Sequence, residues 1–275
     1  MEKPIVYLAE TEDRTSFVKW VLQKFQTDFT HPQKLKVLVK PNIVSHETYP
    51  TTTHPQVLAS VLDFLVKCGC QVVVADGPAF DAGDSERIIA NHPLRQVCHE
   101  RGIELQNLHK QGFKKVKAES MSLEISNLAL NSDYIISLPV LKPHGHCHMT
   151  GALKNQFGFL RNRERLMMHA RIKSLSKGIA EVNRIVRPNL FIVDAIKTYR
   201  RANERRHGGI EVRLGYMLAG RDPVALDSLG LKLLKSVETS LYDEHPENIA
   251  YIAHAIQLGL GSIEYEVERF SKTGQ

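Results

Sequence analysis

The stretch from Leu138 to Gly158, LPVLKPHGHCHMTGALKNQFG, gathers the side chains with the most chemistry in the chain. His144, His146 and His148 stand at alternate positions within it. In an extended chain all three imidazoles point to one face, and in a helix His144 and His148 still share a face. The spacing therefore predicts a site for a divalent metal ion ligated by these histidines. The alternative is a solvated loop whose histidines bind nothing.

A second kind of chemistry is indicated at the end of the same stretch. Thr150 is expected to be the N-cap of a helix that begins at Gly151. Free backbone N–H groups in the first turn, together with Lys154 and Asn155, would attract a phosphate or a carboxylate. The alternative is an ordinary capped helix with an exposed lysine.

Strands and helices must position these residues. Short apolar runs predict buried strands at 5–9, 36–40, 71–75, 134–138 and 190–193. Helical spacing predicts helices at 13–25, 57–67, 172–186, 223–236 and 248–258. The alternation predicts a single α/β domain over 1–275, with a mostly parallel sheet and helices on both faces. The segment 82–132, which includes a predicted hairpin at 115–125, is a candidate for a small inserted subdomain.

Polar side chains follow the predicted strands, where the carboxyl ends of a parallel sheet form a ligand-binding crevice. We expect the catalytic residues there to be Lys142, Asp76 and Asp194, which would act as acids, bases or metal ligands. We expect a second group to hold an anionic ligand, composed of Lys40, Asn42, Thr150, Lys154 and Asn155. Asp76 precedes Gly77 and Pro78, so a simple turn is the alternative for this residue. Asp222 and Asp227 are explained without function, as the N-cap and first-turn carboxylate of a helix.

The bulk composition limits the class of protein. The chain has 275 residues, a formal net charge of +6 and four cysteines. Because no CxxC pair is present, we expect no iron–sulfur cluster held by cysteine alone. No run of eighteen apolar residues and no signal-peptide layout is found, so we expect a cytoplasmic protein without a membrane partner.

An excess of basic residues between 161 and 206 is the main local charge feature. Such an excess suits anionic partners, including phosphorylated metabolites and nucleic acids. No motif of a known nucleic-acid-binding module accompanies it. Within this region, the basic segment 197–209 ends in glycine and is expected to be a mobile cover.

Several motifs together resemble a known family. They are Lys40-Pro41-Asn42, Ala75-Asp76-Gly77, Leu141-Lys142-Pro143-His144, the segment 150–155 with Gly158, Val193-Asp194 and the segment 219–227. In this order, over residues 36–230, they resemble the family called domain of unknown function 362. The resemblance implies an α/β fold and no particular reaction. Some members carry appended ferredoxin-like iron–sulfur modules, so a redox role of this chain would need a separate redox partner.

Two functions are compatible with these patterns. The first is an enzyme that binds a small phosphate- or carboxylate-bearing ligand at the carboxyl ends of the strands, with or without a divalent metal. The second is a non-catalytic module that binds a metal, a cofactor or nucleic acid. No nucleophile–base pair, dinucleotide-binding loop or Walker loop narrows the choice.

Overall fold

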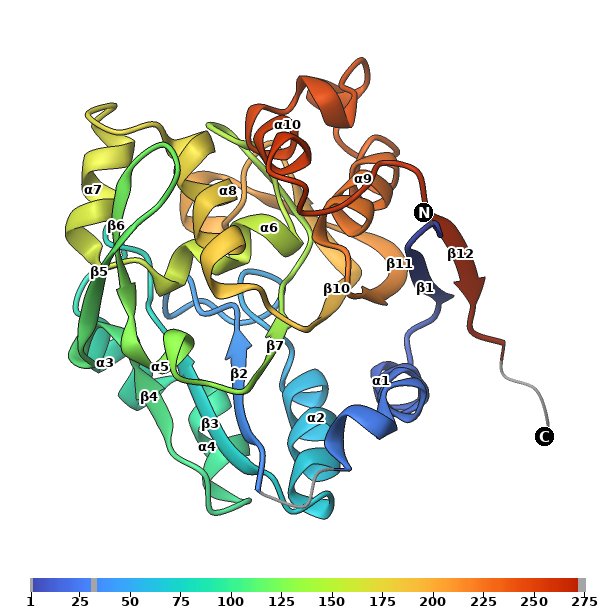
Figure 1. Ribbon diagram of the computed structural model, residues 1–275. Coiled ribbons are helices and arrows are strands. Elements are labelled where there is room, and N and C mark those ends of the chain that lie inside the picture. The colour runs from blue at the N-terminus through green and yellow to red at the C-terminus, as the bar shows by residue number, and fades with distance from the viewer. Residues whose placement is uncertain (1, 31–33, 272–275) are drawn as a thin grey trace.

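A twisted central sheet organises the protein, as the computed structural model of residues 2–30 and 34–271 shows (Figure 1). In the described part of the chain this sheet has eight strands in the order β12-β1-β11-β10-β7-β2-β3-β4. Their bounds, in that order, are Glu266–Arg269, Ile5–Glu10, Ile210–Gly220, Leu190–Arg200, Tyr134–Leu138, Lys36–Pro41, Gln71–Asp76 and Leu105–Asn107. Only β11 runs antiparallel to its neighbours. The predicted mostly parallel α/β sheet is confirmed.

The chain leaves the two central strands in opposite directions. From β2 it passes through α2 (Pro55–Lys67) to β3, and from β7 it passes through α8 (Leu175–Val186) to β10. β2 and β7 are neighbours, paired in parallel from Val37 to Pro41. The order of the sheet therefore reverses between β2 and β7, and a crevice forms outside their carboxyl ends.

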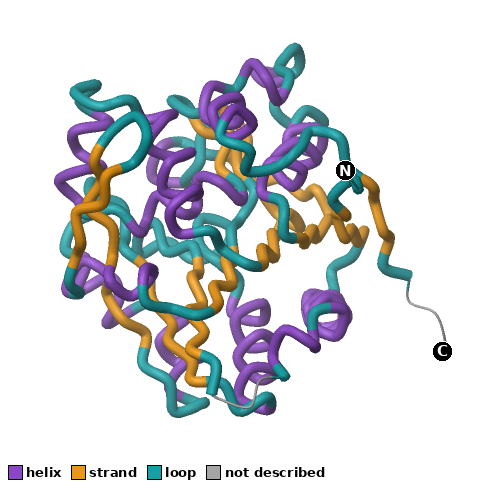
Figure 2. The backbone as a smooth tube through the Cα atoms, viewed as in Figure 1, coloured by secondary structure: helices purple, strands orange, loops and turns teal. Residues whose placement is uncertain are grey.

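Alternating side chains of the strands enter two separate cores. Leu38 and Ile135 pack on the side of α6 (Ala152–Asn155), α8, α9 (Pro223–Leu234) and α10 (Ala250–Gln257). Val39 and Ile136 pack on the opposite side, against α1 (Arg14–Lys24), α2, α3 (Ser85–Asn91) and α4 (Pro93–His99). The strands are rich in leucine and β-branched residues and are apolar on both sides. Helices therefore cover both faces of the sheet, as Figure 2 also shows.

The remaining elements are short. β5 (Phe113–Lys117) and β6 (Ser122–Ser126) form the predicted hairpin, and β8 (Lys142–His144) and β9 (His148–Thr150) form a second one. α5 spans Asn127–Leu130 and α7 spans Asn162–His169. Turns of 3-10 helix lie at Gln26–Phe29, Leu108–Lys110, Gln156–Phe159, Arg205–His207, Thr239–Leu241 and Pro246–Asn248. The segment 82–132 contributes β4 to the central sheet and β5–β6 to a separate two-stranded sheet.

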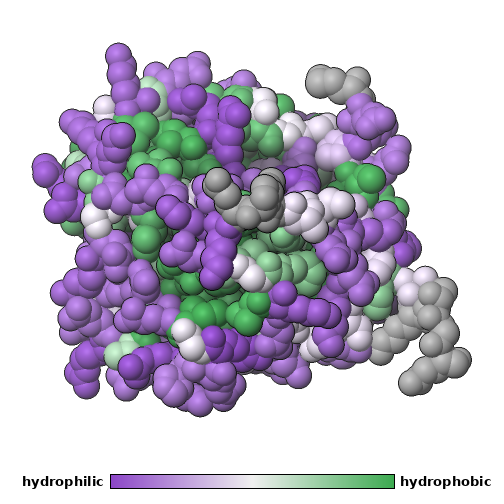
Figure 3. Space-filling view, turned by 60° about the horizontal axis from the view of Figure 1, so that its bottom comes forward, coloured by the Kyte–Doolittle hydropathy of each residue, from purple (hydrophilic) through white to green (hydrophobic). Residues whose placement is uncertain are grey.

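One face of the molecule is mostly polar. Figure 3 shows one face on which hydrophilic side chains predominate and apolar side chains are visible in smaller patches between them. Within the described residues, every helix is too short or too polar to cross a lipid bilayer.

Two predicted boundaries are corrected by the structure. The helix expected at 172–186 begins at Leu175, because Ser174 caps it by accepting the N–H of Lys177. The strand expected at 190–193 continues to Arg200 and pairs with β11 over most of its length. Asp194 is therefore an interior residue of a long strand and not the residue at its tip. The expected cover at 197–209 is reduced to the loop 201–209.

The start of α6 also differs from the prediction. Thr150 ends β9, and Gly151 occupies the N-cap position without a side-chain cap. The carboxylate of Asp227, on α9, accepts the N–H groups of Ala152 at 2.6 Å and Leu153 at 3.2 Å. Burial raises the pKa of Asp227 to about 7. The amides that were expected to bind an external anion are thus already occupied by this carboxylate.

Replacing Asp227 with alanine should destabilise the protein. Two buried amides would lose their acceptor, and each loss costs about 1–3 kcal/mol. We expect urea unfolding at neutral pH to show a free energy of unfolding lower by about 2 kcal/mol or more. Asp243→Ala, at an exposed position, is the matched control and should leave the midpoint unchanged. Equal midpoints for the two variants would contradict the capping role.

Candidate functional site

A small pocket opens at the carboxyl ends of β2, β3 and β7, next to α6, with a volume of about 80 Å³. Seven side chains that were predicted as site residues line it: Lys40, Asn42, Asp76, Lys142, Thr150, Lys154 and Asn155. They lie far apart in the sequence and meet because parallel strands place their carboxyl ends at one edge. We call this cavity the inner pocket.

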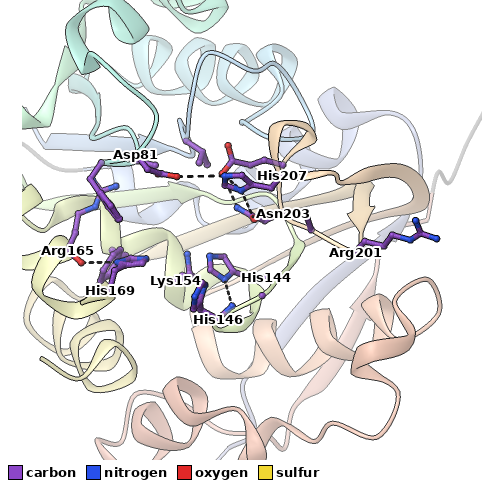
Figure 4. Close-up of a pocket in the computed structure, with 16 residues that line it drawn as sticks. Asp81, His144, His146, Lys154, Arg165, His169, Arg201, Asn203 and His207 are labelled. Carbon is purple, nitrogen blue, oxygen red and sulfur yellow. Dashed lines mark hydrogen bonds and ion pairs between the residues drawn. The ribbon is translucent and has the colours of Figure 1, made fainter. Parts of the chain in front are cut away.

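A larger cavity of about 500 Å³ adjoins the inner pocket, and we call it the outer pocket. The two share the lining residues Val44, Ala79, Lys154, Phe157, Arg165 and Asn203. In Figure 4, Lys154, His144, His146 and His169 lie on one side of the outer pocket. Asp81, Asn203 and His207 lie on the other side. The shared lining makes the two cavities one continuous cleft.

A buried ion pair forms the floor of the inner pocket. Lys40 Nζ lies 2.5 Å from Asp76 Oδ1, and both side chains are at most 2% exposed. Asp76 also accepts the N–H groups of Gly77 at 2.7 Å and Ile43 at 2.6 Å. Gly158 covers the pair so closely that a Cβ atom there would lie 2.6 Å from Asp76 Oδ1. Both oxygens of Asp76 are thus engaged in holding Lys40 and the loops after β2 and β3.

Lys142 is the second buried cation of the inner pocket. Its side chain is 1% exposed, and its Nζ donates to the carbonyl oxygen of Thr51 at 2.5 Å. Among the described residues it forms no ion pair. Burial lowers the pKa of Lys142 to about 7, against the opposing effect of Glu204 and Glu47. At neutral pH this amine can therefore both donate and accept a proton.

Lys154 and Arg165 complete the set of cations. Lys154 has no ion pair or hydrogen bond with another described residue, and burial lowers its pKa. Arg165 donates through Nη1 to the carbonyl oxygen of Gly77 at 3.0 Å, while its buried Nε finds no partner among the described residues. Burial lowers the pKa of Arg165 to about 10. Both cations lie within about 6 Å of the centre of the Phe157 ring.

The inner pocket thus carries unbalanced charge. Lys40, Lys142, Lys154 and Arg165 line it together with the single carboxylate of Asp76. Buried cations without counter-ions are costly, and a bound anion removes that cost. Asn42 adds a buried Oδ1 atom without a partner in the described chain, which is an acceptor for a hydroxyl or protonated group.

The three histidines expected to share a metal ion lie on one hairpin, but their side chains have different surroundings. β8 and β9 run antiparallel with His144 opposite His148, and His148 has a φ of 63°. His148 Nδ1 lies 3.3 Å from Glu244, whereas His144 and His146 line the outer pocket. Within the described residues, no three His, Cys, Asp or Glu side chains are grouped so that they could hold a metal ion. The single-face arrangement predicted from the sequence is therefore wrong.

Two histidines of the outer pocket carry their protons on different ring nitrogens when they are neutral. His144 Nδ1 accepts the backbone N–H of His146 at 3.1 Å, so a neutral His144 carries its proton on Nε2. His169 Nδ1 lies 2.8 Å from the carbonyl oxygen of Arg165 and must donate to it, which leaves Nε2 as an acceptor. Burial and nearby cations, Lys154 among them, lower the pKa of both histidines. At neutral pH His144 is thus an imidazole donor and His169 an imidazole acceptor in this pocket.

Asp194, predicted to be catalytic, lies outside both pockets. Its Oδ2 pairs with Arg14 Nε at 2.6 Å, and both side chains are buried. Its Oδ1 accepts the hydroxyl of Tyr49 at 2.7 Å and the N–H of Ile196 at 3.0 Å. The structure therefore places this carboxylate in a satisfied network that fixes β10 against α1.

The loop 201–209 forms the wall opposite α6, and carboxylates of other segments, Glu47 and Asp81 among them, hold it in place. Glu47 accepts the backbone N–H groups of Arg205 at 3.0 Å and Arg206 at 2.7 Å. The Arg206 guanidinium lies 3.1 Å from Asp81. These contacts join the loops after β2 and β3 to the β10–β11 connection around the cleft.

The sequence did not single out Arg165, His169, Asn203 or Phe157 as site residues. A signal for two of them exists, because Arg165 and His169 are four residues apart and share a face of α7. Other members of the basic excess form ion pairs outside the cleft, namely Arg161–Glu124, Lys173–Glu164, Arg184–Glu181 and Lys197–Glu211. Much of the charge that suggested nucleic acid is compensated locally.

The fold and the cleft define an α/β protein with a cationic pocket at the point where the strand order of a mostly parallel sheet reverses. The family model called Domain of unknown function (DUF362) matches residues 37–232. The chain therefore belongs to this family, as its motifs predicted.

A curated relative and two solved structures are similar to the chain. The thylakoid-associated protein sll1697 of Synechocystis sp. (strain ATCC 27184 / PCC 6803 / Kazusa) is 26% identical over 242 residues, which is 84% of this chain and 70% of that protein. The lactate racemase apoprotein of Thermoanaerobacterium thermosaccharolyticum matches with a TM-score of 0.51 and 14% identity over 78% of this chain. A Thermotoga maritima protein matches with a TM-score of 0.41 and 12% identity, over 88% of this chain and 59% of its own. This chain spans 54% of the racemase chain, and at such identity the match shows the fold alone.

The lowered pKa of Lys142 predicts a pH-dependent effect of Lys142→Met on stability. Between pH 7 and 10.5 the unfolded chain retains a proton that the folded lysine releases, so the contribution of this group to stability rises with pH across this window and is constant below pH 7. The stability of the wild type relative to Lys142→Met should rise over this window by at most about 1.4 kcal/mol per pH unit. Urea unfolding at pH 7, 8, 9 and 10 measures it.

Lys19→Met is the matched control, because Lys19 is exposed on α1. Its difference from the wild type should stay constant over the same pH range. A constant difference for Lys142→Met as well would show that Lys142 titrates like a solvated lysine.

Proposed function

We propose that this chain is an enzyme that binds a small molecule through a phosphate or carboxylate group in the inner pocket. One observation carries the proposal: Lys142, Lys154 and Arg165 are gathered in one cavity without a carboxylate of their own. Among the described residues that line the pocket, the one carboxylate, that of Asp76, is paired with Lys40. A ligand carboxylate or phosphate would supply the missing acceptor for the orphaned Arg165 Nε and for Lys154.

The reaction we propose is a proton transfer next to the bound anionic group. His169 would be the general base, since its Nε2 is an acceptor in the outer pocket. His144 would donate through Nε2 to an oxygen of the substrate. Lys142, with a pKa of about 7, would stabilise negative charge that develops on the substrate or return the proton. Lys40 and Asp76 would hold the floor of the site in place.

The Synechocystis relative is described as thylakoid-associated. We propose a cytoplasmic location for this chain, supported by its four cysteines, which are all free as is usual in a reducing compartment.

Lys154→Gln should weaken the binding of a simple anion. Calorimetric titration of the full chain with inorganic phosphate and with acetate, at pH 7 and low salt, should show binding of at least one of them. We expect Lys154→Gln to weaken it roughly tenfold or more, because one charge-assisted hydrogen bond contributes about 1.5–3 kcal/mol.

Lys177→Gln is the control, since Lys177 is an exposed lysine of α8 away from the cleft. It should bind like the wild type. If neither anion binds the wild type, or if both variants bind equally well, the anion site is refuted.

A further inference from the structure

The cleft is much larger than an anionic group alone requires. The inner pocket of about 80 Å³ holds the cations, and the outer pocket of about 500 Å³ opens directly from it. Cavities of roughly 300–1,000 Å³ are the size that encloses whole metabolites or cofactors. The two adjoining volumes therefore fit a ligand with a compact anionic group at one end and a larger remainder, the ligand body, at the other.

The outer pocket has an aromatic wall, composed of Phe80, His146, Phe157 and His169. His169 stands at its centre, with ring centroids 4.9 Å from Phe80, 5.8 Å from Phe157 and 6.5 Å from His146. The contact with Phe80 is edge-to-face, at an interplanar angle of 62°. Each ring thus fixes its neighbour, and the wall is a preformed surface for a planar group.

The wall is largely uncharged at neutral pH. His169 is a neutral imidazole, because burial and the nearby cations Lys154 and Arg165 lower its pKa. Its Nδ1 proton is held by the Arg165 carbonyl oxygen, which fixes the plane of the ring. A neutral ring of fixed orientation can stack on another ring without the cost of desolvating a charge.

Hydrogen-bonding groups face this wall from the loop 201–209. Asn203 lines both pockets. Its side-chain Nδ2 donates a hydrogen bond to Glu204 Oε1, in the same loop, at 3.0 Å. His207 and Asp81 lie on the same side (Figure 4). A ligand body would therefore have a ring-stacking surface on one side and polar side chains on the other.

We propose that the ligand is a phosphate monoester bearing a planar nitrogen heterocycle, as in a nucleoside monophosphate. The phosphate occupies the inner pocket among Lys142, Lys154 and Arg165. The heterocycle lies against Phe80 and His169, and the sugar-sized linker passes Asn203, which borders both cavities. The inference rests on the proposed function, because the inner pocket must first be an anion site.

The test compares three probes that differ only in what is attached to the phosphate. Inorganic phosphate, ribose 5-phosphate and adenosine 5′-monophosphate are titrated calorimetrically into the full chain at pH 7 and low salt. We expect adenosine 5′-monophosphate to bind about tenfold or more tightly than ribose 5-phosphate, which is the gain from stacking one base on aromatic side chains.

Two variants locate the ring. Phe80→Ala should bring the ratio of the two dissociation constants close to one, and His169→Gln, which tests the same wall should Phe80→Ala not fold, should lower it as well. His254→Ala removes a histidine from α10, outside the cleft, and should keep the wild-type ratio.

The outcomes separate the two proposals. A ratio close to one in the wild type, with phosphate still bound, would overturn the inference and leave the anion site standing. Failure of all three probes to bind would refute the proposed function and the inference with it. A large ratio that neither Phe80→Ala nor His169→Gln reduces would show that the ring does not lie on this wall.

Discussion

The cleft depends on one buried carboxylate. Asp76 neutralises Lys40 and, at the same time, accepts backbone N–H groups from the loops that follow β2 and β3. Breaking a buried pair on one side costs about 3–5 kcal/mol, because the remaining charge has no solvent around it. The contacts of Asp76 therefore fix the two loops and neutralise one cation at the base of the pocket. The other cations of the inner pocket have no carboxylate paired with them among the described residues.

Neighbouring lysines and histidines of the cleft lie in different electrostatic environments, and these differences determine what each group can do. Lys40 is paired, whereas Lys142 is buried beside a carbonyl oxygen and has a pKa near neutrality. His144 and His169 are both kept neutral, yet backbone contacts fix their protons on different nitrogens. Groups that differ in this way can act as acid, base and electrostatic anchor within one cavity.

Much of the fold and part of the site could be predicted from the sequence. Short apolar runs ended by proline or polar residues identified the central strands, and parallel pairing then required Lys40, Asp76 and Lys142 to meet. Asp194 was expected at the end of a strand, but β10 continues through a bulge for six residues beyond it. The ion-pair partner of Asp194, Arg14, is 180 positions away in the sequence. No local pattern reports such a distant partner. Arg165 was likewise hidden in a run of basic residues whose other members lie at the surface.

The occupied start of α6 has a consequence for how this fold can change its ligand. In many α/β proteins the main-chain amides at a helix start grip the anion, and a new specificity needs a rebuilt loop. Here Asp227 accepts the amides of Ala152 and Leu153, so an anion in the inner pocket would be bound by lysine and arginine side chains. Single codon changes at those side chains can retune selectivity while the backbone stays the same. A protein with this layout could therefore change its ligand without a change of architecture.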